Sequence, residues 1–252
     1  MISRKCLIGL AIVLGVLTVP HRLNAQPTLR IYGTEGLLSA PLKECAELFR
    51  RSKGVAVTIT EGIEGRWIAT ARQNADIVFG GSEYMMTDFM IRNRGLIDPL
   101  TRITLYCRSV CILVRAGNPK EIGSMEDLTR PGIRIIEVVG AAQLGLWEDV
   151  AGILGIIPGI RANVVFSVRT SAEAIRQFRK NLGIDAWITY ESLHYNMPED
   201  SEIVLLPEGQ RIARGTPFAV TNISRNREYA LQFLEFLKSD EAHGIFQRWG
   251  WK

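Results

Sequence analysis

The sequence holds little of the chemistry on which metal sites and nucleophilic enzymes are built. Its 252 residues include 3 histidines and 4 cysteines, and the histidines at positions 21, 194 and 243 are widely separated. Metal centres and nucleophile–histidine pairs need such side chains in clusters. The sequence also contains no Gly-x-Ser-x-Gly elbow and no P-loop. We therefore expect a protein that is not an enzyme, with no catalytic residue, no cofactor and no bound metal.

An excess of basic charge is also missing. The formal net charge of +4 includes Arg4, Lys5 and Arg22, which lie in a segment that we expect to be removed. Without these three, 27 basic residues stand against 26 acidic ones. A nearly neutral chain offers no electrostatic footprint for nucleic acid, so we expect no nucleic-acid partner.

Long apolar runs are confined to the N-terminus. Residues 1–25 combine a basic start, an apolar stretch over 6–19 and the small-residue site Leu23-Asn24-Ala25, a pattern typical of a secretory signal peptide. The stretch is short for a membrane span, although an uncleaved anchor is the alternative. We expect a soluble, exported protein that begins at Gln26 and resides in the periplasm.

Three cysteines remain after that cleavage, at positions 45, 107 and 111. An odd number leaves at least one thiol unpaired. Cys107 and Cys111 lie in an expected strand, where four residues span roughly 13 Å, too far for a disulfide. We expect buried free thiols.

Glycine-bearing turns follow three expected strands in the first third of the mature chain. The strands cover 29–32, 55–59 and 77–79, and the turns cover 33–36, 61–65 and 80–82. Each turn leads into an amphipathic helical pattern, and Ser39 is placed to cap the first helix. Right-handed crossovers of this kind make a parallel sheet. The three turns should then share one edge of the sheet, where ligands bind in α/β folds.

The rest of the chain predicts a second lobe. A long β-rich segment over 103–114 can pass from one lobe into the next, and strands follow near 133–139, 164–166 and 185–190. The strand at 202–206 should lead back, and two amphipathic helices over 226–238 and 239–249 end the sequence. The expected architecture is a two-lobed α/β protein, each lobe a mostly parallel sheet flanked by helices. Residues 26–106 and 205–252 form lobe I, residues 107–204 form lobe II, and the ligand cleft lies between them.

Several longer segments carry a resemblance to a known family. They are ADIVFGGSEYMMTDF at 75–89, GNPK at 117–120, GLWEDVAG at 145–152, DAW at 185–187 and FQRWGW at 246–251. Over its whole mature length the chain resembles type II periplasmic solute-binding proteins of the molybdate- and sulfate-binding branch, with closest similarity to the accessory colonization factor AcfC group. The resemblance implies a monomeric two-lobe clamp that captures a small anion, such as sulfate, for an ABC permease or a chemoreceptor in the inner membrane.

An anion in such a clamp is held by backbone N–H groups and neutral hydroxyls at helix N-termini. This logic places ligand contacts at strand-end turns of both lobes. The expected ligand-binding residues are Thr34, Gly62, Arg66, Gly81, Ser82, Ala141, Gln143 and Tyr190.

The first two turns depart from the molybdate-binding pattern. They carry Glu35 and Glu64 in place of serines, and carboxylates beside an anion are unfavourable unless another group neutralises them. Sulfate, an organic acid and a zwitterion, bound through Arg66, all remain candidate ligands. The alternative is that Arg66 is a solvated residue on the helix surface. Adhesion through surface contact and catalysis on a small anion are the competing functions.

Overall fold

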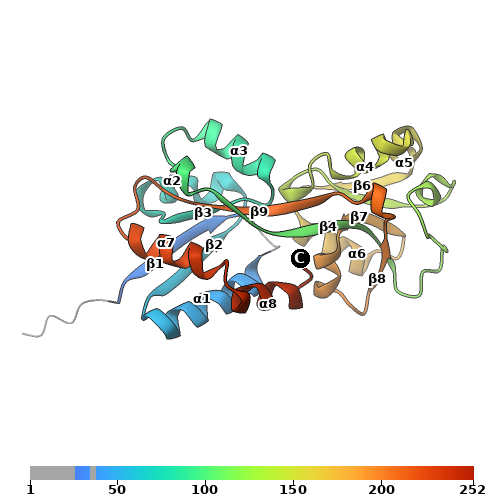
Figure 1. Cartoon of the computed structure of the whole chain (residues 1–252). Coiled ribbons are helices and arrows are strands. Elements are labelled where there is room, and N and C mark those ends of the chain that lie inside the picture. Colours follow the sequence, from blue (N-terminus) through green and yellow to red (C-terminus); the bar gives the residue numbers. More distant parts are fainter. Residues whose placement is uncertain (1–25, 35–37) are drawn as a thin grey trace, which may run out of the picture.

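The computed structural model describes residues 26–34 and 38–252. In this part of the chain the strands form one continuous mixed sheet in the order β2-β1-β3-β9-β4-β7-β5-β6, with β8 paired to β4. Figure 1 shows two lobes, each with its own end of the sheet, joined by β4 and β9. The two-lobed α/β architecture expected from the sequence is confirmed. The division at 106/107 and 204/205 stays a prediction.

Parallel strands form the centre of the first lobe. β1 (Thr28–Gly33) pairs in parallel with β2 (Ala56–Glu61) and with β3 (Ile77–Phe79). The register sets Gly33 opposite both Glu61 and Phe79. The three strands therefore end side by side, which confirms that the turns begin at one edge of the sheet. Residues 35 and 36 of the first turn lie outside the described residues.

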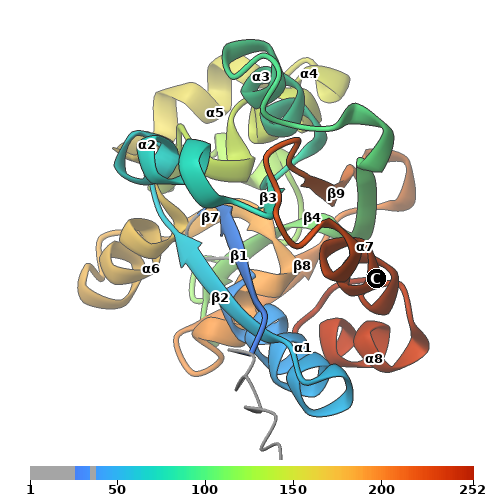
Figure 2. The ribbon, with the colours of Figure 1, turned by 90° about the vertical axis from the view of Figure 1, so that its left-hand side faces the viewer.

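Helices cover both faces of this sheet. In Figure 2, α1 (Ser39–Lys53), α7 (Arg227–Phe236) and α8 (Asp240–Arg248) lie on one side of the sheet, and α2 (Glu64–Asn74) and α3 (Glu83–Arg92) on the other. Alternate strand residues supply the two cores: Ile31 and Ile77 belong to the cluster under α1, and Tyr32 and Val78 to the cluster under α2. This alternation is the period of two of a strand buried on both faces. Helix α1 begins at Ser39 with Leu38 as its N-cap residue, so the expected serine cap is wrong.

Two antiparallel strands cross between the lobes. β4 (Ile103–Arg115) pairs with β9 (Ala213–Val220) up to Ser109, and with β7 and β8 from Val110 and Cys111 onward. One strand thus belongs to the part of the sheet in each lobe. A register shift interrupts its pairing with β9 between Leu105 and Arg108.

The return crossing differs from the expectation. β8 (Ser201–Leu205) stays in the second lobe and pairs with β4, and β9 leads back. The sequence of β9 does not read as a strand, because it contains Arg214, Gly215 and Pro217 and strands seldom contain glycine or proline. Pro217 donates no hydrogen bond to the ladder, but its carbonyl oxygen accepts one from the Gly80 amide at 2.9 Å.

The second lobe repeats the parallel arrangement. β5 (Ile135–Val138) runs parallel to β6 (Val164–Val168) and to β7 (Ala186–Tyr190). Helices α4 (Leu146–Leu154), α5 (Ile157–Asn163) and α6 (Ser171–Lys180) flank it. The pattern Thr170-Ser171-Ala172-Glu173 predicts a capping box at the start of this helix. In agreement, the Thr170 hydroxyl caps α6 by accepting a hydrogen bond from the Glu173 amide at 3.1 Å. The described chain also contains short 3-10 helices: η1 (Pro99–Thr101), η2 (Glu126–Thr129), η3 (Ala141–Gln143), η4 (Glu191–Asn196) and η5 (Glu208–Gln210).

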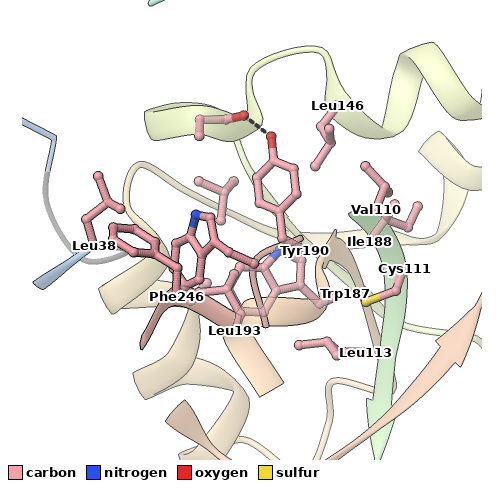
Figure 3. Close-up of a cluster of buried hydrophobic side chains, with 14 of the residues drawn as sticks. Leu38, Val110, Cys111, Leu113, Leu146, Trp187, Ile188, Tyr190, Leu193 and Phe246 are labelled. Carbon is pink, nitrogen blue, oxygen red and sulfur yellow. Dashed lines mark hydrogen bonds between the residues drawn. The ribbon is translucent and has the colours of Figure 1, made fainter. Parts of the chain in front are cut away.

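Buried side chains of both lobes meet near the crossing strands. Figure 3 shows Leu38 and Phe246 of the first lobe beside Tyr190 and Leu193 of the second, next to β4 residues such as Val110. Apolar contact therefore continues across the junction of the lobes and supports their relative position. No described helix is both long and apolar enough to cross a membrane.

The cysteines Cys45, Cys107 and Cys111 are all free, as expected, but Cys107 is exposed rather than buried. It lies where the pairing of β4 with β9 shifts register. Burial raises the pKa of the Cys45 thiol to about 12 and that of Cys111 well above its usual value.

We expect a thiol reagent at neutral pH to label one cysteine of the native mature protein and three after denaturation, because the reactive form is an accessible thiolate. Mass spectrometry of the labelled protein counts the modified residues. The Cys107→Ser variant is the control and should lose native labelling. Rapid labelling of two native thiols would contradict the burial of Cys45 and Cys111.

Candidate functional site

A cavity of about 370 Å³ lies between the lobes, at the carboxyl ends of their strands. The first lobe contributes the ends of β1, β2 and β3 and the faces of α2 and α3. The second lobe contributes the segments that follow β5 and β6. Its lining residues are Thr34, Gly62, Ile63, Glu64, Trp67, Val78, Phe79, Gly80, Met85, Met86, Asp88, Phe89 and Arg92 from the first lobe, and Val139, Gly140, Leu144, Arg169 and Thr170 from the second.

Most of this lining is apolar. Trp67 forms the centre of one wall, with its ring 5.8 Å from the rings of both Tyr32 and Phe89. Its indole N–H donates to the Gly62 carbonyl at 3.1 Å, which fixes the ring beside the β2 turn. Met85 and Leu144 add apolar surface from opposite lobes. A wall of this kind suits a solute with a hydrocarbon part.

The charged side chains of the first lobe that line the cavity are paired with one another. Arg92 forms ion pairs with Glu64 and with Asp88, each at 2.7 Å. Hydrogen bonds with Asp88 and then Glu64 raise the pKa of Arg92. The Asn93 amide donates to the second oxygen of Glu64 at 3.0 Å. Glu64 thus lines the cavity without presenting a free carboxylate, while Glu35 lies outside the described residues.

Arg169 differs from these groups. It follows β6 on the cavity wall, and its side chain is exposed. Among the charged side chains of the described lining, Arg169 alone forms no ion pair or side-chain hydrogen bond with another described residue. Thr170 follows it as the N-cap of α6, so a cation and a hydroxyl stand together at a helix N-terminus. An anionic group is favoured at such a place by charge and by the helix dipole.

The lobes touch behind the cavity. A Cβ atom on Gly81 would lie 2.8 Å from the Cβ of Ala142, so only glycine fits this contact without a shift. The Tyr190 hydroxyl donates to the Ala142 carbonyl at 2.5 Å, the dashed line in Figure 3. Burial raises the pKa of the Tyr190 phenol, with Arg108 acting in the opposite direction. The Gly81 carbonyl accepts a hydrogen bond from Arg108.

Only part of the expected site lines the cavity. Thr34 and Gly62 do so, while Gly81 and Tyr190 form the contact behind it. The Arg66 side chain is exposed on α2 and outside the lining.

The remaining expected residues lie close by. Ser82 is buried and caps α3 through the Met85 amide at 3.4 Å. Ala141 begins η3, next to the cavity residue Gly140. Both ends of the Gln143 amide are engaged inside the second lobe, with Ser171 at 3.0 Å and Trp187 at 3.1 Å. Ligand contact by the eight residues stays a prediction.

Sequence reasoning missed Arg169 and Trp67 as cavity residues. Arg169 could have been found, because it stands between an expected strand and an expected helix cap, like the residues chosen in the first lobe. Nothing in the sequence distinguishes Trp67 from a core tryptophan. No group of three or more His, Cys, Asp or Glu side chains placed to hold a metal occurs in the part of the chain that the structure describes.

Solved structures share the fold of this chain. The chain is similar to PEB3 from Campylobacter jejuni, with 27% identity, a TM-score of 0.79 and coverage of 89% of this chain and 99% of that one. A PEB3 structure described as bound to L-phospholactate matches with 26% identity, a TM-score of 0.80 and the same coverage.

More distant structures share the fold. The sulfate-binding protein SubI from Mycobacterium tuberculosis matches with 19% identity, a TM-score of 0.73 and coverage of 89% of this chain and 86% of that chain. The periplasmic molybdate-binding protein of Azotobacter vinelandii matches with 19% identity, a TM-score of 0.68 and coverage of 89% and 98%. A search of curated protein sequences finds no relative.

The family model described as bacterial extracellular solute-binding protein matches residues 29–252, nearly the whole described chain. The resemblance seen in the sequence is thereby confirmed. The chain belongs to the bacterial extracellular solute-binding protein family.

Proposed function

We propose that this protein captures a small organic anion in the periplasm and delivers it to an ABC importer or a chemoreceptor. The anion is held between the two lobes, with its charged group at Arg169 and the α6 N-terminus and its hydrocarbon part against Trp67. The protein binds its solute without converting it. Thr34 and Gly62 at the strand ends of the first lobe provide further polar contacts.

The single observation that carries this proposal is the combination of an unpaired arginine with a largely apolar wall in one cavity. A bare sulfate ion has no apolar surface to place against Trp67, Met85 and Leu144. A carboxylate or phosphate ester with a short hydrocarbon part uses both features. The description of a PEB3 structure as bound to L-phospholactate supports an anion of this class.

The sequence-based preference for sulfate therefore becomes the second candidate. The 19% identical sulfate- and molybdate-binding structures support the fold and leave the ligand open. Neither adhesion through surface contact nor catalysis on a small anion is favoured by a specific feature of the described residues.

Replacement of Arg169 tests the ligand class. We expect the mature protein to bind at least one of L-phospholactate, L-lactate, succinate and butyrate more tightly than inorganic sulfate or molybdate in calorimetric titrations. Arg169→Gln should weaken that binding by about 10- to 100-fold, the range of one charge-assisted hydrogen bond of about 1.5–3 kcal/mol.

Arg66→Gln is the matched control for Arg169→Gln, because Arg66 is an exposed arginine that does not line the cavity. It should leave the affinity within about twofold, as for a surface charge. Preference for sulfate over every organic anion would overturn the proposed class. Loss of affinity in Arg66→Gln alone would move the anion to α2.

Replacement of Gly81 tests whether binding requires the two lobes to meet. Gly81 lacks the positive φ angle that disfavours other residues, so Gly81→Ala should leave each lobe folded. The added methyl group would collide with Ala142 across the junction. Overpacking of this kind is unfavourable by about 1–3 kcal/mol, so we expect affinity for the best anion to fall about 5- to 100-fold.

Gly65→Ala serves as the control, because a Cβ atom there meets nothing within 4 Å. Melting temperatures without added solute should be similar for both variants and the parent protein. Unchanged affinity in Gly81→Ala would show that the Gly81–Ala142 contact does not accompany binding.

A further inference from the structure

Arg108 is a buried cation on the crossing strand β4, and it is 1% exposed. Its guanidinium lies over the Tyr190 ring, with Cζ 4.2 Å from the ring centroid. One nitrogen, Nη2, donates to the Gly81 carbonyl. The other two, Nε and Nη1, are buried without an acceptor among the described residues.

The acidic groups nearby are engaged elsewhere. Asp149 pairs with Arg214. An oxygen of Glu83 accepts a hydrogen bond from the Gly215 amide at 3.0 Å. No described carboxylate forms a salt bridge with Arg108. Burial lowers the pKa of Arg108, with opposing contributions from Tyr190 and Glu83.

An isolated buried cation with unused donors is unfavourable, because desolvation is not repaid by a counter-ion or hydrogen bonds. The two contacts that Arg108 makes, with the Tyr190 ring and with the Gly81 carbonyl, do not require a positive charge, since a neutral side chain can pack on a ring and donate to a carbonyl. Arg108 is therefore better explained by an anionic oxygen that it contacts in a complex.

The position of Arg108 connects it to the cleft. Gly81, which accepts its hydrogen bond, follows the cavity residue Gly80. Ala142, whose carbonyl oxygen accepts a hydrogen bond from the Tyr190 hydroxyl, lies two residues beyond the cavity residue Gly140. Arg108 and Tyr190 thus stand directly behind the contact of the two lobes, at the inner end of the cleft.

We propose that Arg108 forms a second anion subsite at the inner end of the cleft, so that the solute carries two anionic groups. This inference rests on the proposed function, in which Arg169 receives the first group. The Nε–H and Nη1–H groups of Arg108 donate hydrogen bonds to an oxygen of the second carboxylate or phosphate. The Tyr190 hydroxyl can donate to the same group instead of to the Ala142 carbonyl. The solute class is a small dicarboxylate or a phosphorylated hydroxy acid.

A comparison of two protein variants with two matched ligand pairs tests this subsite. L-phospholactate and L-lactate, or succinate and butyrate, differ by one anionic group. Calorimetric titration should show the dianion of at least one pair binding the parent protein more tightly. Arg108→Met should weaken binding of that dianion about 10- to 100-fold and binding of its monoanion less than about threefold. Arg225→Met, at an exposed site outside the cavity lining, should change neither.

The melting temperature without added solute separates a ligand subsite from a structural role. Replacement of an uncompensated buried charge by an apolar side chain is expected to leave it unchanged or raise it. A lower melting temperature with unchanged dianion affinity would assign Arg108 to the fold and overturn the subsite, as would equal losses for both members of a pair.

The results that would overturn the subsite would not contradict the proposed function, because an organic anion would still bind. Failure of the parent protein to bind any organic anion of the two pairs would instead overturn the proposed function, and the subsite with it.

Discussion

The structure depends on one constraint, a strand that is shared by the two lobes within one continuous sheet. β4 pairs with β9 in the first lobe and with β7 and β8 in the second. Because backbone hydrogen bonds hold it on both sides, the lobes cannot separate without bending this strand and its partner β9. Movement is therefore confined to rotation about the crossing strands, the usual form of hinge closure around a ligand. The edges of the two parallel sheets face one another across this hinge and create the cavity.

The distribution of charge defines what this cavity can hold. Glu64, one of the two carboxylates that argued against an anion in the sequence, is paired with Arg92, which also pairs with Asp88. The other, Glu35, lies outside the described residues. In the described chain, Arg169 on the cavity wall forms no ion pair or side-chain hydrogen bond, and Arg108 behind the cavity has two buried nitrogens without an acceptor. The apolar wall around Trp67 distinguishes this site from one suited to a bare inorganic ion. These features support our proposal that an organic anion is held between the two lobes.

Local patterns in the sequence predicted much of this fold. The glycine turns after the first three strands, the cap at Thr170 and the long strand around Cys111 are all found as predicted. β9 was missed, because its glycine and proline are tolerated through tertiary pairing that no local pattern records. The exposure of Cys107 depends in the same way on a register shift between distant strands.

The site was harder to predict than the fold. Strand-end positions such as Thr34 and Gly62 follow from topology, and the structure places them on the cavity wall. The engagement of Gln143 and the pairing of Glu64 with Arg92 depend on side chains far away in the sequence. Arg108 gave no local signal at all, since an arginine within a strand is usually exposed. Its burial and its unused nitrogens become visible only in three dimensions.

The central claim is that an organic anion is enclosed by the meeting of the two lobes. Small-angle scattering of the mature protein, with and without a saturating concentration of its tightest-binding anion, measures this enclosure directly. The account predicts a smaller radius of gyration in the presence of the anion, because the hinge at β4 and β9 closes. An unchanged radius at full occupancy would show that the solute binds to a rigid surface and would contradict the clamp.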